Sequence, residues 1–132
     1  MATSIPDSHR SLLGSDVAAF ATVGADGRPQ VSAVWFLAEG DTVRISLHTS
    51  RQKTKNLRRN PACSVFLLDL ANPYRYLEIR GDAVVAPDDG YAFADKLGAK
   101  YGSDLRAMDG DDQSRVVVTV VPSRINAVDM SG

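Results

Sequence analysis

Apolar and polar residues alternate along several short stretches of the chain, which is the pattern of strands with one buried face. In 42–48 the apolar residues Val43, Ile45 and Leu47 fall on one face and polar residues on the other. Turn-forming sequences such as 24–27 separate the early stretches. The predicted strands are 17–23, 30–37, 42–48, 62–70, 74–85 and 115–121, with 124–129 as a continuation of the last.

Three further stretches carry the capping and stop residues of helices. Helices are expected over 7–13, over 50–60 and, as the longest, over 87–101. Ser50 is the expected N-cap of the second helix, and Asp88 or Asp89 that of the third. The polar stretch 104–114 is expected to form a loop.

Strands outnumber helices, and the connections between the first three strands are too short for parallel crossovers. Within the long strand 74–85, Gly81 is expected to mark a β-bulge, and Pro122 is expected to mark a kink or a strand edge. We therefore predict a mainly β fold of the α+β type, in which about six strands form an antiparallel barrel with peripheral helices.

The composition fits one globular domain over residues 1–132, with 44% apolar and 23% charged residues. Residues 1–16 are expected to be an N-terminal helix or arm, and 126–132 a tail. Cys63 is the single cysteine, so an internal disulfide is impossible. The first ten residues hold no apolar signal segment and no apolar run is long enough to cross a membrane. The expected localisation is therefore cytoplasmic, without a membrane partner.

Charge is distributed unevenly although the net charge is only −1. No acidic residue occurs between Asp41 and Asp69. That interval holds six cations: Arg44, Arg51, Lys53, Lys55, Arg58 and Arg59. A local basic run in a nearly neutral chain favours an anionic small molecule over nucleic acid, which a strongly basic protein would bind.

The most informative segment is 46–57, where a strand's polar face leads through a hydroxyl-rich loop into a basic helix start. Thr49, Ser50 and Thr54 supply hydroxyls, and the first N–H groups of a helix lack partners inside the helix. Arg51 and Lys53 add charge suited to a phosphate. The charge pattern alone leaves a solvated basic helix face as an equal alternative.

Three segments in order resemble one flavoprotein family. They are 49–57 followed by Asn60-Pro61, the strand 72–81, and the stretch 96–102. Together they look like the pyridoxamine 5′-phosphate oxidase-like superfamily, and the last resembles its small actinobacterial-type members, which use the deazaflavin coenzyme F420. The resemblance extends from about Val17 to Ile125.

This resemblance implies a split β-barrel of the FMN-binding type and a homodimer with two cofactor sites at the interface. The cations would hold the coenzyme's phosphate or acidic tail, Asn56 would fix the loop, and Tyr74 and Tyr76 would approach from the partner subunit. The implied site residues are Val34, Trp35, Ser46, His48, Thr49, Ser50, Arg51, Lys53, Lys55, Asn56, Tyr74 and Tyr76. The implied reaction is hydride transfer from the reduced deazaflavin to a conjugated small molecule.

Alternatives remain open for several of these residues and for the cofactor. A tryptophan in an apolar strand, such as Trp35, is more often a core residue than one that stacks on a ring, and His48 is also explained as a polar residue at a strand end. FMN is the alternative cofactor, because it shares the ribityl-phosphate part of F420. A binding protein for a flavin, F420 or haem that catalyses nothing is a third possibility. No residue is assigned as catalytic, and two histidines and one cysteine are too few for a typical zinc site.

Overall fold

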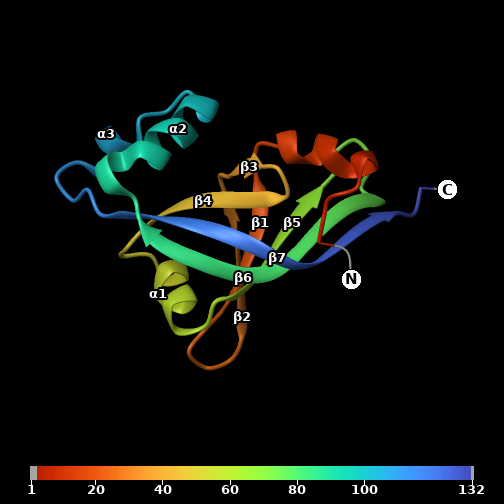
Figure 1. Ribbon diagram of the computed structural model, residues 1–132, viewed down its shortest axis with the longest axis horizontal. Coiled ribbons are helices and arrows are strands. Elements are labelled where there is room, and N and C mark those ends of the chain that lie inside the picture. The colour runs from red at the N-terminus through yellow and green to blue at the C-terminus, as the bar shows by residue number, and fades with distance from the viewer. Residues whose placement is uncertain (1–2, 132) are drawn as a thin grey trace.

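The computed structural model describes residues 3–131, and its main element is one antiparallel sheet of seven strands. The strands are β1 (Ala18–Val23), β2 (Pro29–Val34), β3 (Leu37–Glu39), β4 (Thr42–His48), β5 (Ala62–Leu68), β6 (Arg75–Pro87) and β7 (Arg115–Asp129). Their order in the sheet is β2-β1-β5-β6-β7-β4-β3. The sheet curls into a split barrel (Figure 1). The prediction of about six strands missed β3, which is only three residues long.

The two longest strands, β6 and β7, lie side by side near the middle of the sheet. Their register shifts between Arg80 and Gly81, so the predicted bulge is confirmed. A Cβ atom at Gly81 would lie 2.1 Å from the carbonyl oxygen of Val121, which explains the glycine. Pro122 faces this bulge and does not end the strand, because β7 continues to Asp129. Residues 126–129 are therefore strand rather than tail.

Alternating residues of the central strands form the core inside the curled sheet. The predicted buried face of β4 is confirmed, since Val43, Ile45 and Leu47 are all buried. On its polar face Ser46 is also buried, with 8% of its surface exposed. The residues 1, 2 and 132, which belong to the expected arm and tail, lie outside the described residues. Residues Asp7–Gly14 form the 3-10 helix η1, close to the expected helix over 7–13.

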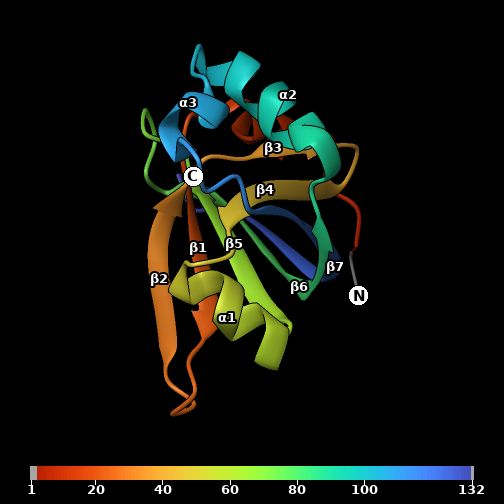
Figure 2. The same ribbon diagram turned by 90° about the vertical axis from the view of Figure 1, so that its left-hand side faces the viewer.

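The remaining helices are α1 (Gln52–Arg59), the short η2 (Asp89–Tyr91), α2 (Ala92–Tyr101) and α3 (Leu105–Asp109). The prediction that 104–114 is a loop was wrong, because α3 begins there. Asp104 caps it by accepting hydrogen bonds from the backbone N–H groups of Arg106 and Ala107. We call α2 and α3 together the cap. The cap and α1 lie on opposite sides of β4 (Figure 2).

Neither predicted N-cap holds that position in its α-helix. Tyr91 is the N-cap of α2, although Asp88 still accepts hydrogen bonds from the N–H groups of Phe93 and Ala94 in the first turn. Ser50 does not cap α1, since Arg51 holds that position and makes no side-chain capping bond. The helix start is fixed instead by Thr54, whose hydroxyl donates to the carbonyl oxygen of His48 at 2.8 Å.

Candidate functional site

A cavity of about 300 Å³ lies where β2 and β4 meet the start of α1, the cap and the first residue of β7. Twelve residues line it: Ala33, Val34, Trp35, Ser46, Leu47, His48, Arg51, Lys53, Leu97, Leu105, Met108 and Arg115. Six of them belong to the predicted site, namely Val34, Trp35, Ser46, His48, Arg51 and Lys53. The fold thus brings together residues that are up to 82 positions apart, from Ala33 to Arg115.

Arg51 and Lys53 give the cavity positive charge without a matching acid. Neither forms an ion pair with any described residue, whereas cations such as Arg44 and Lys96 pair with Glu39. Burial lowers the pKa of the Lys53 ammonium, and the adjacent charge of Arg51 lowers it further. Arg51 is exposed and Lys53 partly buried, so the two like charges repel each other only weakly through solvent, and an anion in the cavity would relieve that repulsion.

His48 connects the loop before α1 to the loop before β7. Its Nδ1 accepts a hydrogen bond from the backbone N–H of Ser50 at 3.1 Å, and its Nε2 lies 3.0 Å from the carbonyl oxygen of Asp112. These partners assign the proton of the neutral ring to Nε2. The side chain is only 14% exposed. His48 therefore holds the loop before α1 and the loop before β7 together at the cavity.

Ser46 and Arg115 form a polar floor on the adjacent strands β4 and β7. Arg115 donates from Nε and Nη2 to the two carboxylate oxygens of Asp109, at 2.6 and 2.9 Å, and from Nη1 to the Ser46 hydroxyl at 3.3 Å. The guanidinium holds the pKa of Asp109 below its usual range. Burial and Asp109 raise the pKa of Tyr91 to about 12, so its hydroxyl keeps its proton and donates to Asp109 at 2.6 Å.

Trp35 forms one wall and lies between β2 and β3, not within a strand. Its ring stacks on Tyr101 of α2, with centroids 4.4 Å apart and planes 6° from parallel. The Tyr101 hydroxyl accepts from the N–H of Phe36 at 3.1 Å and lies 2.7 Å from the carbonyl oxygen of Asp16. The cap thus fixes the orientation of Trp35, which packs on the cap's apolar cluster and also borders the cavity.

Other predicted residues support the site or lie outside it. Thr49 bonds to Ser114 by its backbone and its hydroxyl, so it ties two loops together. Asn56 is fully buried and donates to Thr22 and Gln30, which agrees with a role in fixing the local structure. Lys55 is exposed on α1 and does not line the cavity.

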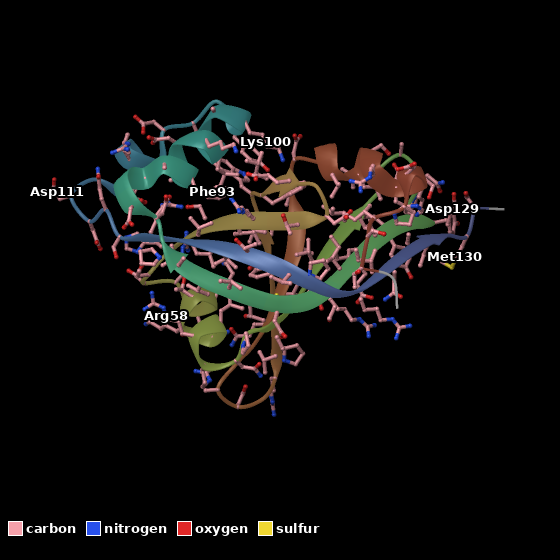
Figure 3. All side chains as sticks on the ribbon, viewed as in Figure 1. Arg58, Phe93, Lys100, Asp111, Asp129 and Met130 are labelled. Carbon is pink, nitrogen blue, oxygen red and sulfur yellow. The ribbon has the colours of Figure 1, made fainter. Side chains whose placement is uncertain are left out.

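Tyr74 and Tyr76 do not meet the cavity of their own chain. Tyr76 is the second residue of β6 and Tyr74 lies in the turn just before that strand, where its carbonyl oxygen accepts a hydrogen bond from Met130. Asp129 and Met130 mark one end of the molecule, and Asp111, next to the cap, marks the other (Figure 3). Tyr76 packs against Phe66, while Tyr74 is 59% exposed. Their approach from a partner subunit stays a prediction.

The cap's contribution to the cavity was not predicted from the sequence. Leu97, Leu105 and Met108 form an apolar wall, and Arg115 reaches in from the first position of β7. One signal was present: Asp104 directly before a Leu-Arg-Ala-Met stretch is a typical helix start.

No helix among residues 3–131 is both long and apolar enough to span a membrane.

Comparisons with known proteins agree with this architecture. The family pattern described as Pyridoxamine 5′-phosphate oxidase matches residues 5–129. A solved structure described as an F420 reductase is 39% identical, with a TM-score of 0.82, over 92% of this chain and 98% of that one. A pyridoxamine 5′-phosphate oxidase-type protein of Listeria innocua is 25% identical, with a TM-score of 0.73, over 92% and 95% of the two chains.

A conserved hypothetical protein of Mycobacterium tuberculosis shares the fold, with a TM-score of 0.76 at 23% identity over 98% of this chain and 88% of that one. Because the family pattern covers nearly all of the sequence, the chain belongs to the pyridoxamine 5′-phosphate oxidase-like split β-barrel superfamily. Its relatives are of the oxidoreductase type, and this is the class that the fold and family define for it.

Proposed function

We propose that this protein is a reductase that uses reduced coenzyme F420 to deliver a hydride to a conjugated small molecule. The observation that carries the proposal is the pair Arg51 and Lys53, which face a cavity with an aromatic wall and form no ion pair with any residue from 3 to 131. A ligand with a planar ring and a phosphate matches both the aromatic wall and the two cations. The 39% identity to an F420 reductase supports the deazaflavin as the ring.

The residues present fit such a coenzyme. Arg51 and Lys53 would hold its phosphate, since charged donors make strong bonds to phosphate oxygens. Val34 and Trp35 would lie along its ring, and Lys55, exposed on the same helix, would face its acidic tail. When bound, the reduced deazaflavin supplies the hydride, while the chain binds, orients and excludes water.

A second copy of the chain would complete the site. A volume of about 300 Å³ is at the lower limit for a ligand pocket, and a coenzyme with an acceptor needs more. Tyr74 is exposed, and its carbonyl oxygen accepts a hydrogen bond from Met130, which lies at the opposite end of the molecule from Asp111 (Figure 3); there it is free to reach a partner's cavity. Val31, 71% exposed on the outer strand β2, offers apolar surface to the same partner. We therefore propose a homodimer with two sites.

FMN is the second candidate, because its single phosphate also fits the cation pair. The family pattern is that of pyridoxamine 5′-phosphate oxidase, and this observation favours it. An enzyme purified yellow and loaded with FMN would support an oxidase of the same fold. The two candidates are separated by comparing the affinities of the two coenzymes for one protein sample.

The test is a titration of F420 and of FMN into coenzyme-free protein. The fluorescence of Trp35, the chain's single tryptophan, reports binding. We expect F420 to bind more tightly than FMN. Lys53→Met should weaken F420 binding at least tenfold, because a charged hydrogen bond contributes about 1.5–3 kcal/mol. The matched control Lys55→Met should lose less, since Lys55 lies outside the cavity. Equal affinities of wild type and Lys53→Met would contradict the proposal.

A further inference from the structure

The cavity contains a second polar position, distinct in character from the Arg51–Lys53 pair. It is built by Ser46 of β4, which is buried with 8% of its surface exposed, and by Arg115 of β7, which is partly buried with 13% of its side chain exposed. His48 pairs with Arg115 across the two strands, so Arg115 and Ser46 are diagonal neighbours on one sheet face. Both line the cavity.

Donor capacity remains free at this position. A guanidinium has five N–H groups, and the bonds from Arg115 to Asp109 and Ser46 occupy three of them. The Ser46 oxygen accepts from Arg115, which leaves its own hydrogen to donate. The described part of the chain therefore holds a guanidinium and a hydroxyl whose unused donors adjoin the cavity.

The net charge at this position is close to zero, in contrast to the positive charge of the Arg51–Lys53 pair. Asp109 offsets Arg115, with the carboxylate itself only 7% exposed and bonded to Tyr91 as well. Fixed donors with little net charge suit a neutral oxygen acceptor better than a phosphate. Beside them, Leu97, Leu105 and Met108 form an apolar wall that suits a hydrocarbon ring.

The geometry points to Arg115 and Ser46 as a binding site for the carbonyl oxygen of a conjugated, largely apolar molecule. This inference rests on the proposed function and specifies the acceptor: an α,β-unsaturated ketone, quinone or related carbonyl. Hydride addition at the β-carbon breaks the C=C π bond and moves its electron pair toward the carbonyl oxygen, forming an enolate. The two donors stabilise that charge, a proton from water completes the saturated bond, and the coenzyme is oxidised.

Asp109 acts as a positioning residue in this arrangement, since it contacts Arg115 and not the ligand. It fixes the guanidinium plane through two bonds, and Tyr91 fixes Asp109 in turn. The cap thereby orients the donor that belongs to β7. A purely structural ion pair would hold α3 in place without affecting which ligands bind.

The test measures the binding of acetophenone and ethylbenzene to coenzyme-free protein by isothermal titration calorimetry. The two probes share a ring and differ in the carbonyl, so the ratio of their dissociation constants isolates the oxygen contact. We expect Ser46→Ala and Arg115→Lys each to shift this ratio about fivefold toward ethylbenzene, the effect of one hydrogen bond. Ser46→Ala leaves the Arg115–Asp109 pair in place, so it tests the site without disturbing the cap.

Arg106→Lys is the matched control. Arg106 forms the same two-point pair with Asp95 on the cap but does not line the cavity. It should leave the ratio at the wild-type value. An unchanged ratio in Ser46→Ala and Arg115→Lys, an equal shift in Arg106→Lys, or no measurable binding of acetophenone to wild type would overturn the inference.

A second arm repeats the titration with F420 bound and identifies the source of the oxygen. Continued binding of acetophenone with the same ratio assigns the position to the acceptor. Exclusion of acetophenone, with weaker F420 binding in Arg115→Lys, assigns it to a ring carbonyl of the coenzyme. The Lys53→Met titration fails or succeeds independently of these ratios, so the proposed function and the carbonyl site are tested separately.

Discussion

The start of α1 and the cap are both rich in arginine or lysine, yet they use these cations in opposite ways. At the start of α1, Arg51 and Lys53 line the cavity and form no ion pair with any of the described residues. On the cap side, Arg115 is joined to Asp109 through two hydrogen bonds and Arg106 to Asp95 through three. An unpaired cation at a cavity keeps its charge available to an anion, whereas a paired one has its charge offset by the fold and keeps only its unused N–H donors.

The largest effect on stability is expected from breaking the partly buried pair on the cap side. Asp109→Asn leaves the Arg115 charge without its partner, which should lower the free energy of unfolding by about 2 kcal/mol at pH 7, between the values for a surface pair and a fully buried pair. Urea unfolding measures it. Asp95→Asn is the control and should cost much less, because that pair is exposed and screened by solvent.

The same variant has a pH dependence with a defined sign. Arg115 lowers the pKa of Asp109 in the folded protein, so the carboxylate stabilises the fold above its unfolded pKa of about 3.9. This stabilisation is lost as the pH falls through the lower, folded-state pKa. The difference between wild type and Asp109→Asn should therefore shrink below about pH 4, and a constant difference would contradict the ion pair's role.

An intermediate effect is expected where the cap holds the aromatic wall. Tyr101→Phe keeps the ring stacked on Trp35 but removes the hydroxyl that bonds to the backbone of Phe36 and Asp16. We expect a loss of about 1 kcal/mol in urea unfolding, with little change in Trp35 emission. Tyr74→Phe, on an exposed side chain, should show no loss.

The smallest effect, of opposite sign, is expected at α1. Burial and Arg51 lower the pKa of Lys53, which means that the folded state disfavours its charge at pH 7. Lys53→Met should therefore raise the thermal midpoint of the coenzyme-free protein by about 2 °C, a small gain because solvent screens this partly exposed charge. Lys55→Met should leave the thermal midpoint unchanged. A lower midpoint in Lys53→Met would contradict the expectation that the cations at α1, unlike the pair on the cap side, do not stabilise the fold.

Much of the fold was predictable because its signals are local. The alternation of Val43, Ile45 and Leu47 placed β4, and Gly81 marked the bulge correctly. The cap was only partly predicted: Tyr91 adopts a positive φ of 58°, so α2 begins after it, and α3 replaces the expected loop. Such a short helix forms because Leu105 is buried against α2, a contact that no local pattern reveals.

The order of residues alone was enough to locate six of the seven strands, the basic segment at the start of α1 and the family resemblance, because each depends on neighbours along the chain. Tertiary packing decided which of these residues share a cavity. Pairing of β4 with β7 set Arg115 beside Ser46, 69 positions away, and the cap supplied Asp109 and the apolar wall. Strand register and helix docking depend on contacts between distant segments. Only the folded chain therefore shows that the unpaired Lys53 and the paired Arg115 line the same cavity.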